Sequence, residues 1–226
     1  MRELVYLSQA KLQQFRKPTS KRDGLSGGVK LTAGLTGLPS VEANVDYDPV
    51  AAAAGTAATL DQAEEFIRSK WPVRWWTEEL EPGEWMQFET WLVSAVLKDG
   101  IRQVVFWWGR HHFSDGSSVQ LLLHGSPQHL LQSSGDQLPR EAISGSAVAG
   151  LFSYLATAEE DGTDTSDAQW YEAQLDRLVR QLRGIAPEVT ATWVSGMARV
   201  SFSVEDARRR MVVASPLVVE YVPVPR

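Results

Sequence analysis

The chain has 226 residues, and 22 Lys and Arg against 28 Asp and Glu give it a formal net charge of −6. With 43% hydrophobic and 22% charged residues it has the composition of a soluble globular protein, which excludes a chain disordered throughout. No apolar run approaches the roughly 18 residues that cross a bilayer, and the mild acidity argues against a nucleic-acid partner. The absence of cysteine excludes a disulfide framework and thiol catalysis. The first residues lack the apolar core of a signal peptide, so we expect a cytoplasmic protein.

The N-terminal part of the chain predicts a strand, a short helix and, after a connection, a longer helix. Glu3–Leu7 alternates as a strand does, and Ser8 is placed to cap the short helix. Residues 48–60 include an Ala- and Gly-rich run, which favours a flexible connection within one domain. Thr59 then begins a helix that ends before Pro72.

The middle of the chain predicts a three-stranded meander. Its strands are expected over Glu84–Leu97, Arg102–Gly109 and Ser117–His124, and Lys98-Asp99-Gly100 is a good hairpin turn between the first two. Seven of the nine tryptophans lie between Trp71 and Trp108, so this part of the chain is its most distinctive feature.

The C-terminal part predicts two helices followed by two strands. Ala142–Ala156 is expected to be helical, and a second, amphipathic helix follows Ser166 and ends near Gly184. Strands are expected over Val189–Val204 and Met211–Val222. Runs of strands with helices between them favour α+β. We therefore predict one α+β domain over residues 1–226, mainly an antiparallel sheet that can curl towards a barrel, with three or four packed helices.

Four short stretches resemble markers of a known protein family. They are Leu4–Ser8 with Lys11-Leu12, Pro82–Trp85, Leu121–Ser126 with His129-Leu130, and Ser215–Val219. By these stretches the chain resembles a family of uncharacterised bacterial proteins, mainly from actinobacteria. The resemblance implies one shared architecture over most of the chain, and it implies no activity, cofactor or catalytic residue.

All four histidines fall between His111 and His129. In a hairpin of the two later strands, His111 and His112 lie at the tip, and His124 lies six or seven residues away. At about 3.3 Å per residue that separation is about 20 Å, too far for one metal ion. The pattern therefore predicts no metal site and no cofactor.

The turn after His124 leaves three alternatives open. Gly125 permits a close approach of the backbone, and a strand-end turn can hold a polar ligand on its N–H groups. Ser126 and His129 can also be paired as nucleophile and base, which would make the protein a small hydrolase or a metal-assisted enzyme. In the third alternative Gly and Pro simply fix the turn.

The tryptophans pose a similar choice between core and recognition surface. Trp85 and Trp91 share one face of their strand, whereas Trp107 and Trp108 point to opposite faces of theirs. Large aromatic side chains usually pack in the core. If one face is open, it becomes the pocket or interface.

A stripe of arginines recurs on the second C-terminal helix. Arg177, Arg180 and Arg183 are three residues apart, which is typical of the solvated face of a helix. Such a stripe can also hold phosphate or an acidic partner.

The sequence thus favours a non-enzymatic binding or interaction module, with the enzyme using His124, Ser126 and His129 as the alternative. The predicted recognition residues are Trp85, Trp91, Trp107, His124 and His129, and the expected partner is a protein or a small ligand. No membrane association is expected, and the oligomeric state stays open.

Overall fold

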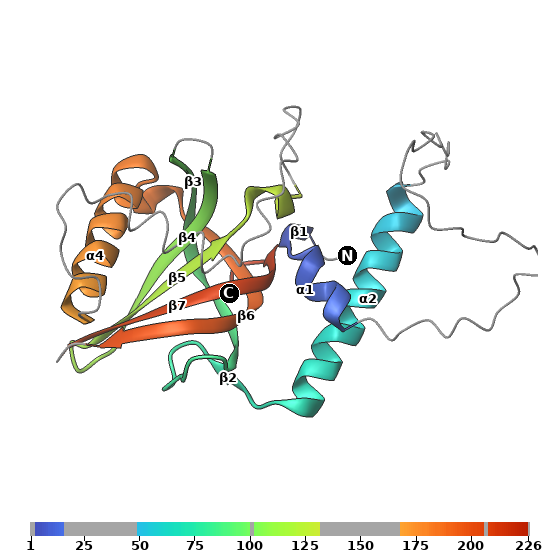
Figure 1. Cartoon of the computed structure of the whole chain (residues 1–226), viewed down its shortest axis with the longest axis horizontal. Helices are drawn as coiled ribbons and strands as arrows, with labels where there is room; N and C mark the ends of the chain where they lie inside the picture. The colour runs from blue at the N-terminus through green and yellow to red at the C-terminus, as the bar shows by residue number, and fades with distance from the viewer. Residues whose placement is uncertain (1–2, 16–48, 100–101, 132–167, 206–207, 226) are drawn as a thin grey trace, which may run out of the picture.

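The computed structural model describes residues 3–15, 49–99, 102–131, 168–205 and 208–225 (Figure 1). The strands of this part of the chain are β1 (Glu3–Leu7), β2 (Val73–Trp75), β3 (Trp85–Asp99), β4 (Arg102–His112), β5 (Ser118–Gly125), β6 (Thr192–Glu205) and β7 (Arg209–Tyr221). Its helices are α1 (Gln9–Gln14), α2 (Pro49–Lys70) and α4 (Ala168–Ile185), with short 3₁₀ turns η1 (Pro127–His129) and η2 (Glu188–Thr190).

Five of the strands close on themselves into a barrel-like sheet. β7 pairs with β5, then β4, β3 and β6 follow in order, and β6 pairs again with β7. The pairings in this ring are antiparallel except for β5 with β7, while β1 adds to β7 and β2 adds in parallel to β3. The predicted α+β class and the antiparallel, barrel-like sheet are therefore confirmed.

The interior of the closed sheet is filled by alternate residues of its strands. Met86, Phe88 and Leu92 of β3 point inward, where they join Trp107 of β4 and Leu121 of β5 in one buried cluster. This is the period of two that a strand imposes on its side chains.

Helices cover two separate parts of the outside of the sheet (Figure 1). α4 lies on one part, where its buried stripe packs against outward side chains of β3, β4, β5 and β7. α1 and α2 lie at the other end of the molecule, over a cluster that includes Trp85, Met197 and Leu217. The buried positions of α4 include Leu175, Leu178 and Leu182, as its sequence predicts.

The long second helix differs from the sequence expectation. α2 begins at Pro49, so the Ala-rich segment 49–58 is its first part rather than a connection. Alanine has the highest helix propensity, and proline is favoured in the first turn, which accounts for the earlier start. The helix expected over Ala142–Ala156 lies outside the described residues. None of the described helices combines the length and the hydropathy that crossing a membrane would require.

Candidate functional site

The seven clustered tryptophans differ sharply in exposure. Trp76, Trp107 and Trp108 are buried, as is Trp85, which packs beneath α1 and α2. Trp91 is 47% exposed, and Trp71, just after α2, is 45% exposed. Two of the predicted recognition residues, Trp85 and Trp107, are therefore interior side chains, and Trp91 is the one that reaches the surface.

Trp91 is exposed because of its place along β3. Trp85 and Trp91 do lie on the outer face of the strand together, as alternation predicts. The start of this face is covered by the helices α1 and α2, whereas Val93 and Leu97 further along lie under α4. Trp91 falls between the two covered regions, next to Trp193 of β6, with the ring centroids 5.4 Å apart and the rings edge to face.

A pocket of about 340 Å³ opens beside Trp91. Its wall is formed by β3, β4 and the segment around η2, and its lining residues are Trp91, Val93, Trp108, Gly109, Arg110, His112, Glu188, Val189 and Ala191. Gly109 is required here, because a Cβ atom at this position would lie 2.3 Å from the carbonyl oxygen of Trp91. The pocket thus combines two indole rings with a cation, an imidazole and a carboxylate.

The indole of Trp108 at the base of this pocket lies beside two arginines. The Cζ atom of Arg183, from α4, is 4.5 Å from the ring centroid, and that of Arg110 is 5.7 Å away. Guanidinium groups at these distances are attracted to the face of an indole. Arg183 also pairs with Glu188 at 3.2 Å, which links α4 to η2.

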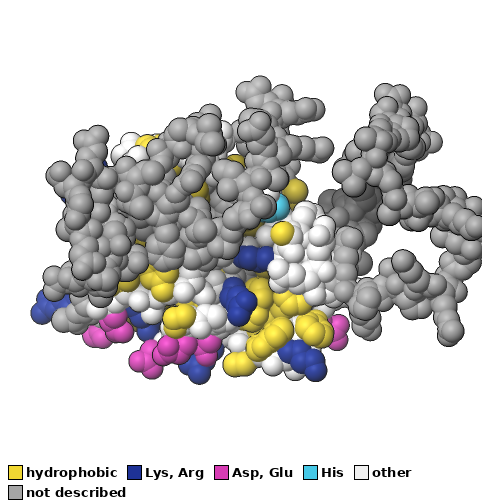
Figure 2. Space-filling model, in the orientation of Figure 1, with side chains coloured by type: hydrophobic (Ala, Val, Ile, Leu, Met, Phe, Trp, Pro, Cys, Tyr) yellow, Lys and Arg dark blue, Asp and Glu magenta, His cyan; other side chains and the backbone are white. Residues whose placement is uncertain are grey.

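A second exposed aromatic surface lies at the other end of the molecule. Phe15, Phe66 and Trp71 follow one another with ring centroids 5.9 and 6.0 Å apart. Figure 2 shows hydrophobic side chains gathered in this region, beside α1 and the C-terminal half of α2. Trp71 is therefore exposed to nearly the same degree as Trp91, but in a different setting.

The turn after β5 holds its two histidines in different surroundings. His124 is fully buried on the outer face of the sheet, with Nε2 3.2 Å from Oγ of Ser201. His129 is half-buried and packs edge to face on Tyr6, with centroids 5.7 Å apart. The backbone N–H of His129 donates to the carbonyl of Ser126, which closes the 3₁₀ turn.

A buried polar group adjoins His129 at the start of α1. Lys11 Nζ donates to the carbonyl and the hydroxyl of Ser215 and to the carbonyl of Pro216, at 2.7, 2.7 and 2.9 Å. Burial, and then the positive charge of Arg199, lower the pKa of Lys11 to about 7. Burial, and then the charge of Lys11, also lower the pKa of His129, so burial shifts both groups towards their neutral forms.

The tip of the β4–β5 hairpin carries the other two histidines, as the sequence predicts. His111 packs on Trp76 and Phe113, while His112 lines the pocket beside Trp91. Register pairs His111 with Val119 and Phe106 with His124, so the two ends of the hairpin are well separated. Among the described residues, no three His, Cys, Asp or Glu side chains are grouped so that they could hold a metal ion.

The sequence alone does not identify Arg110 and Arg183 as pocket residues, although each lies in a recognisable sequence pattern. Alternation along β4 places Trp108 and Arg110 on the same face. The sequence places Arg183 in a stripe typical of a solvated helix face, because helical periodicity does not show which strand lies against the end of the helix.

The stretches on which the family resemblance rests meet in space. Tyr6 contacts the backbone of Ser126 and the side chain of Ser8, and Lys11 contacts Ser215. Arg199 of β6 is paired with Ser215 in the sheet and donates to the carbonyl of Gly83, which connects the stretch Pro82–Trp85 to the same region.

Comparisons with known proteins agree with the resemblance to an uncharacterised family. No curated protein and no solved structure matches the chain. A family model does match, and it covers residues 2–223. The chain therefore belongs to a family of unknown function, DUF7019.

Proposed function

We propose that this protein is a non-enzymatic binding module that holds a small ligand with a flat aromatic or apolar group beside Trp91. The pocket of about 340 Å³ at this residue carries the proposal. Its volume lies in the range of small-molecule sites, which are apolar with a few polar groups for orientation.

The lining of the pocket supports a planar ligand. Trp91 offers an exposed ring supported by Trp193, whose indole N–H donates to Glu89 at 3.0 Å. A supported ring is held in one orientation, so stacking on it costs little conformational entropy. Arg110 and His112 supply hydrogen-bond donors at the rim of the same pocket.

The experiment is a screen of flat aromatic fragments, such as indole, quinoline and adenine, by ligand-observed saturation-transfer NMR. We expect hits whose affinity falls about tenfold in Trp91→Ala, because an aromatic contact contributes roughly 0.5–1.5 kcal/mol beyond the area it buries. Trp71→Ala is the matched control, since Trp71 is equally exposed but lies away from the pocket.

Three outcomes would count against a small-ligand site at Trp91. They are the absence of any fragment hit, equal losses in Trp91→Ala and Trp71→Ala, and an unchanged affinity in Trp91→Ala. Both variants should keep the far-UV circular dichroism of the parent protein, because each replaces an exposed side chain.

A further inference from the structure

A second pocket, between α4 and the outside of the sheet, is lined mainly by arginines. It has a volume of about 270 Å³, and its lining residues are Arg110, Gln120, Asp176, Val179, Arg180, Arg183 and Arg209. The four guanidinium groups come from β4, β7 and α4, so the fold brings together charges that are far apart in the sequence. Asp176 is the acidic member of the lining.

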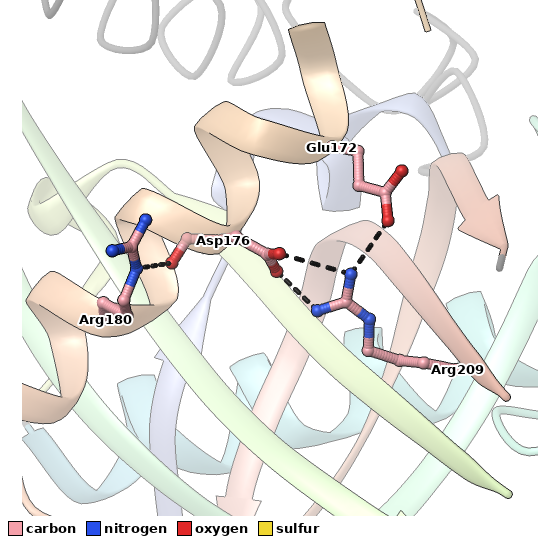
Figure 3. Close-up of polar contacts among 4 residues, drawn as sticks. All are labelled: Glu172, Asp176, Arg180 and Arg209. Carbon is pink, nitrogen blue, oxygen red and sulfur yellow. Dashed lines mark hydrogen bonds and ion pairs between the residues drawn. The ribbon is translucent and has the colours of Figure 1, made fainter. Parts of the chain in front are cut away.

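The charge of one of these arginines is neutralised by acidic side chains. Figure 3 shows Arg209 reaching from β7 to α4, where it lies between Glu172 and Asp176. Its two terminal nitrogens lie 2.5 and 3.3 Å from the carboxylate of Asp176, and one of them is 3.0 Å from Glu172. In the same view the Nε–H of Arg180 donates to the backbone carbonyl of Asp176, at 3.4 Å.

Arg183 also pairs with an acidic side chain, Glu188, whereas Arg110 is repelled by the neighbouring arginines. Burial, and then the positive charge of Arg183, lower the pKa of Arg110, an effect that Glu188 opposes and Arg209 reinforces. Clustered like charges destabilise the fold unless an opposite charge lies among them.

Buried donors in this wall also lack acceptors. Within the part of the chain that the structure describes, the Nε–H groups of Arg110 and Arg183 are buried without a hydrogen-bond partner. Both guanidinium groups are held against Trp108, which limits their freedom to turn towards solvent. Because these two Nε–H groups are closed off from solvent, a ligand in the pocket would be bound by the terminal N–H groups of the lining arginines instead.

We infer that this pocket binds a phosphate group. A phosphate offers several acceptor oxygens and negative charge, and guanidinium groups match it through paired N–H donors. The inference goes beyond the function proposed above, because it requires no aromatic group. Arg110 lines both pockets, so a phosphate ester with a ring could occupy the two together, whereas free phosphate would occupy this one alone.

The test measures binding of inorganic phosphate to the full chain by ³¹P NMR line broadening and by thermal unfolding. We expect phosphate to raise Tm above the value in sodium chloride of equal ionic strength. Loss of one guanidinium in Arg183→Gln should weaken phosphate binding about tenfold, the size expected for one charged hydrogen bond. Arg180→Gln should act in the same direction, and because Arg180 is exposed this variant tests the site without disturbing the fold.

Arg177→Gln is the matched control, since Arg177 is exposed on the same helix and does not line the pocket. It should bind phosphate as the parent protein does. The inference is overturned if phosphate acts only through ionic strength, or if Arg177→Gln weakens binding as much as Arg180→Gln.

Two further arms identify the source of the phosphate and separate this site from the one at Trp91. Tighter binding of phenyl phosphate than of inorganic phosphate supports an ester as the ligand, and equal or weaker binding supports free phosphate. Trp91→Ala should leave inorganic phosphate binding unchanged, so failure of the aromatic pocket would not remove this result. Loss of phosphate binding in Trp91→Ala would overturn an independent site.

Discussion

Lys11 is the residue whose surroundings depart furthest from those of an ordinary lysine. Its ammonium group is buried between α1 and β7, and its acceptors in the described part of the chain are the neutral oxygens of Ser215 and Pro216. The hydrogen bonds favour the charged form, but burial dominates and lowers the pKa to about 7. Lys11 is thus a group whose charge changes near neutral pH.

The lowered pKa of Lys11 predicts a specific pH dependence of stability. Between pH 7 and the usual range of lysine, the unfolded chain binds more protons than the folded one, so the free energy of unfolding rises with pH. We expect Lys11→Met to flatten this rise in urea denaturation. In ¹³C NMR of reductively methylated protein, one lysine resonance should titrate near pH 7 and disappear in Lys11→Met. A set of resonances that all titrate above pH 9 would contradict the prediction.

The tryptophans show what residue patterns can and cannot predict. Alternation correctly predicted that Trp85 and Trp91 share a face and that Trp107 and Trp108 do not. It could not predict that Trp85 is covered and Trp91 is open, because alternation along a strand does not specify where the helices α1 and α2 pack on the sheet. The two-residue period of a strand shows which face a residue lies on, but it does not show which other element covers that face.

At the scale of elements, the sequence predicts the bounds of the strands whose residues alternate in polarity to within a few residues. It does not predict the pairings between strands that are far apart in the chain. β3, β4 and β5 match the predicted meander, and β6 and β7 match the last two strands. The pairing of β3 with β6 and the parallel pairing of β5 with β7 join strands that are far apart in the sequence. Those pairings close the sheet, and no local signal specifies them.

Replacing a glycine by alanine should change the stability of the protein in opposite directions in β4 and in α4. In β4, a Cβ atom at Gly109 would lie 2.3 Å from the Trp91 carbonyl oxygen and 2.5 Å from a methyl group of Leu92. In α4, a Cβ atom at Gly184 would meet no atom of the described residues within 4 Å. We expect Gly109→Ala to destabilise the protein by about 1–3 kcal/mol through overpacking. Gly184→Ala should stabilise it by about 0.5–1 kcal/mol, because alanine favours the helix.

Urea denaturation of the two glycine variants measures both effects as shifts of the midpoint at constant m-value. Each variant serves as the control for the other, since both add a single methyl group. If the urea midpoint falls in Gly184→Ala as well as in Gly109→Ala, the expected stabilisation of α4 by alanine is wrong.

At the scale of the whole molecule, β7 is the strand that holds the sheet together. Residues 210–214 lie between β5 and β6, and residues 218–221 lie between β1 and β6. Its backbone groups therefore have partners on both sides, and nine consecutive residues from Met211 to Val219 are buried.

This position predicts the pattern of amide hydrogen exchange. We expect amides of β7 to be among the slowest to exchange, because they open only when the closed sheet opens. Amides of β2, a three-residue strand that pairs with β3, should exchange much faster. Mass spectrometry of peptides after acid quench, corrected for intrinsic exchange rates, measures the difference. Equal protection of the two strands would contradict the central place of β7.

The position of β7 also has a consequence for how the protein is made. On the ribosome, β1, β5 and β6 are all synthesised before the strand that joins them, and among the described residues the edges that face β7 gain their partner only when residues 209–221 emerge. Exposed strand edges pair readily with other chains. Until β7 is in place, the edges of these three strands that it covers are therefore open to association with other chains.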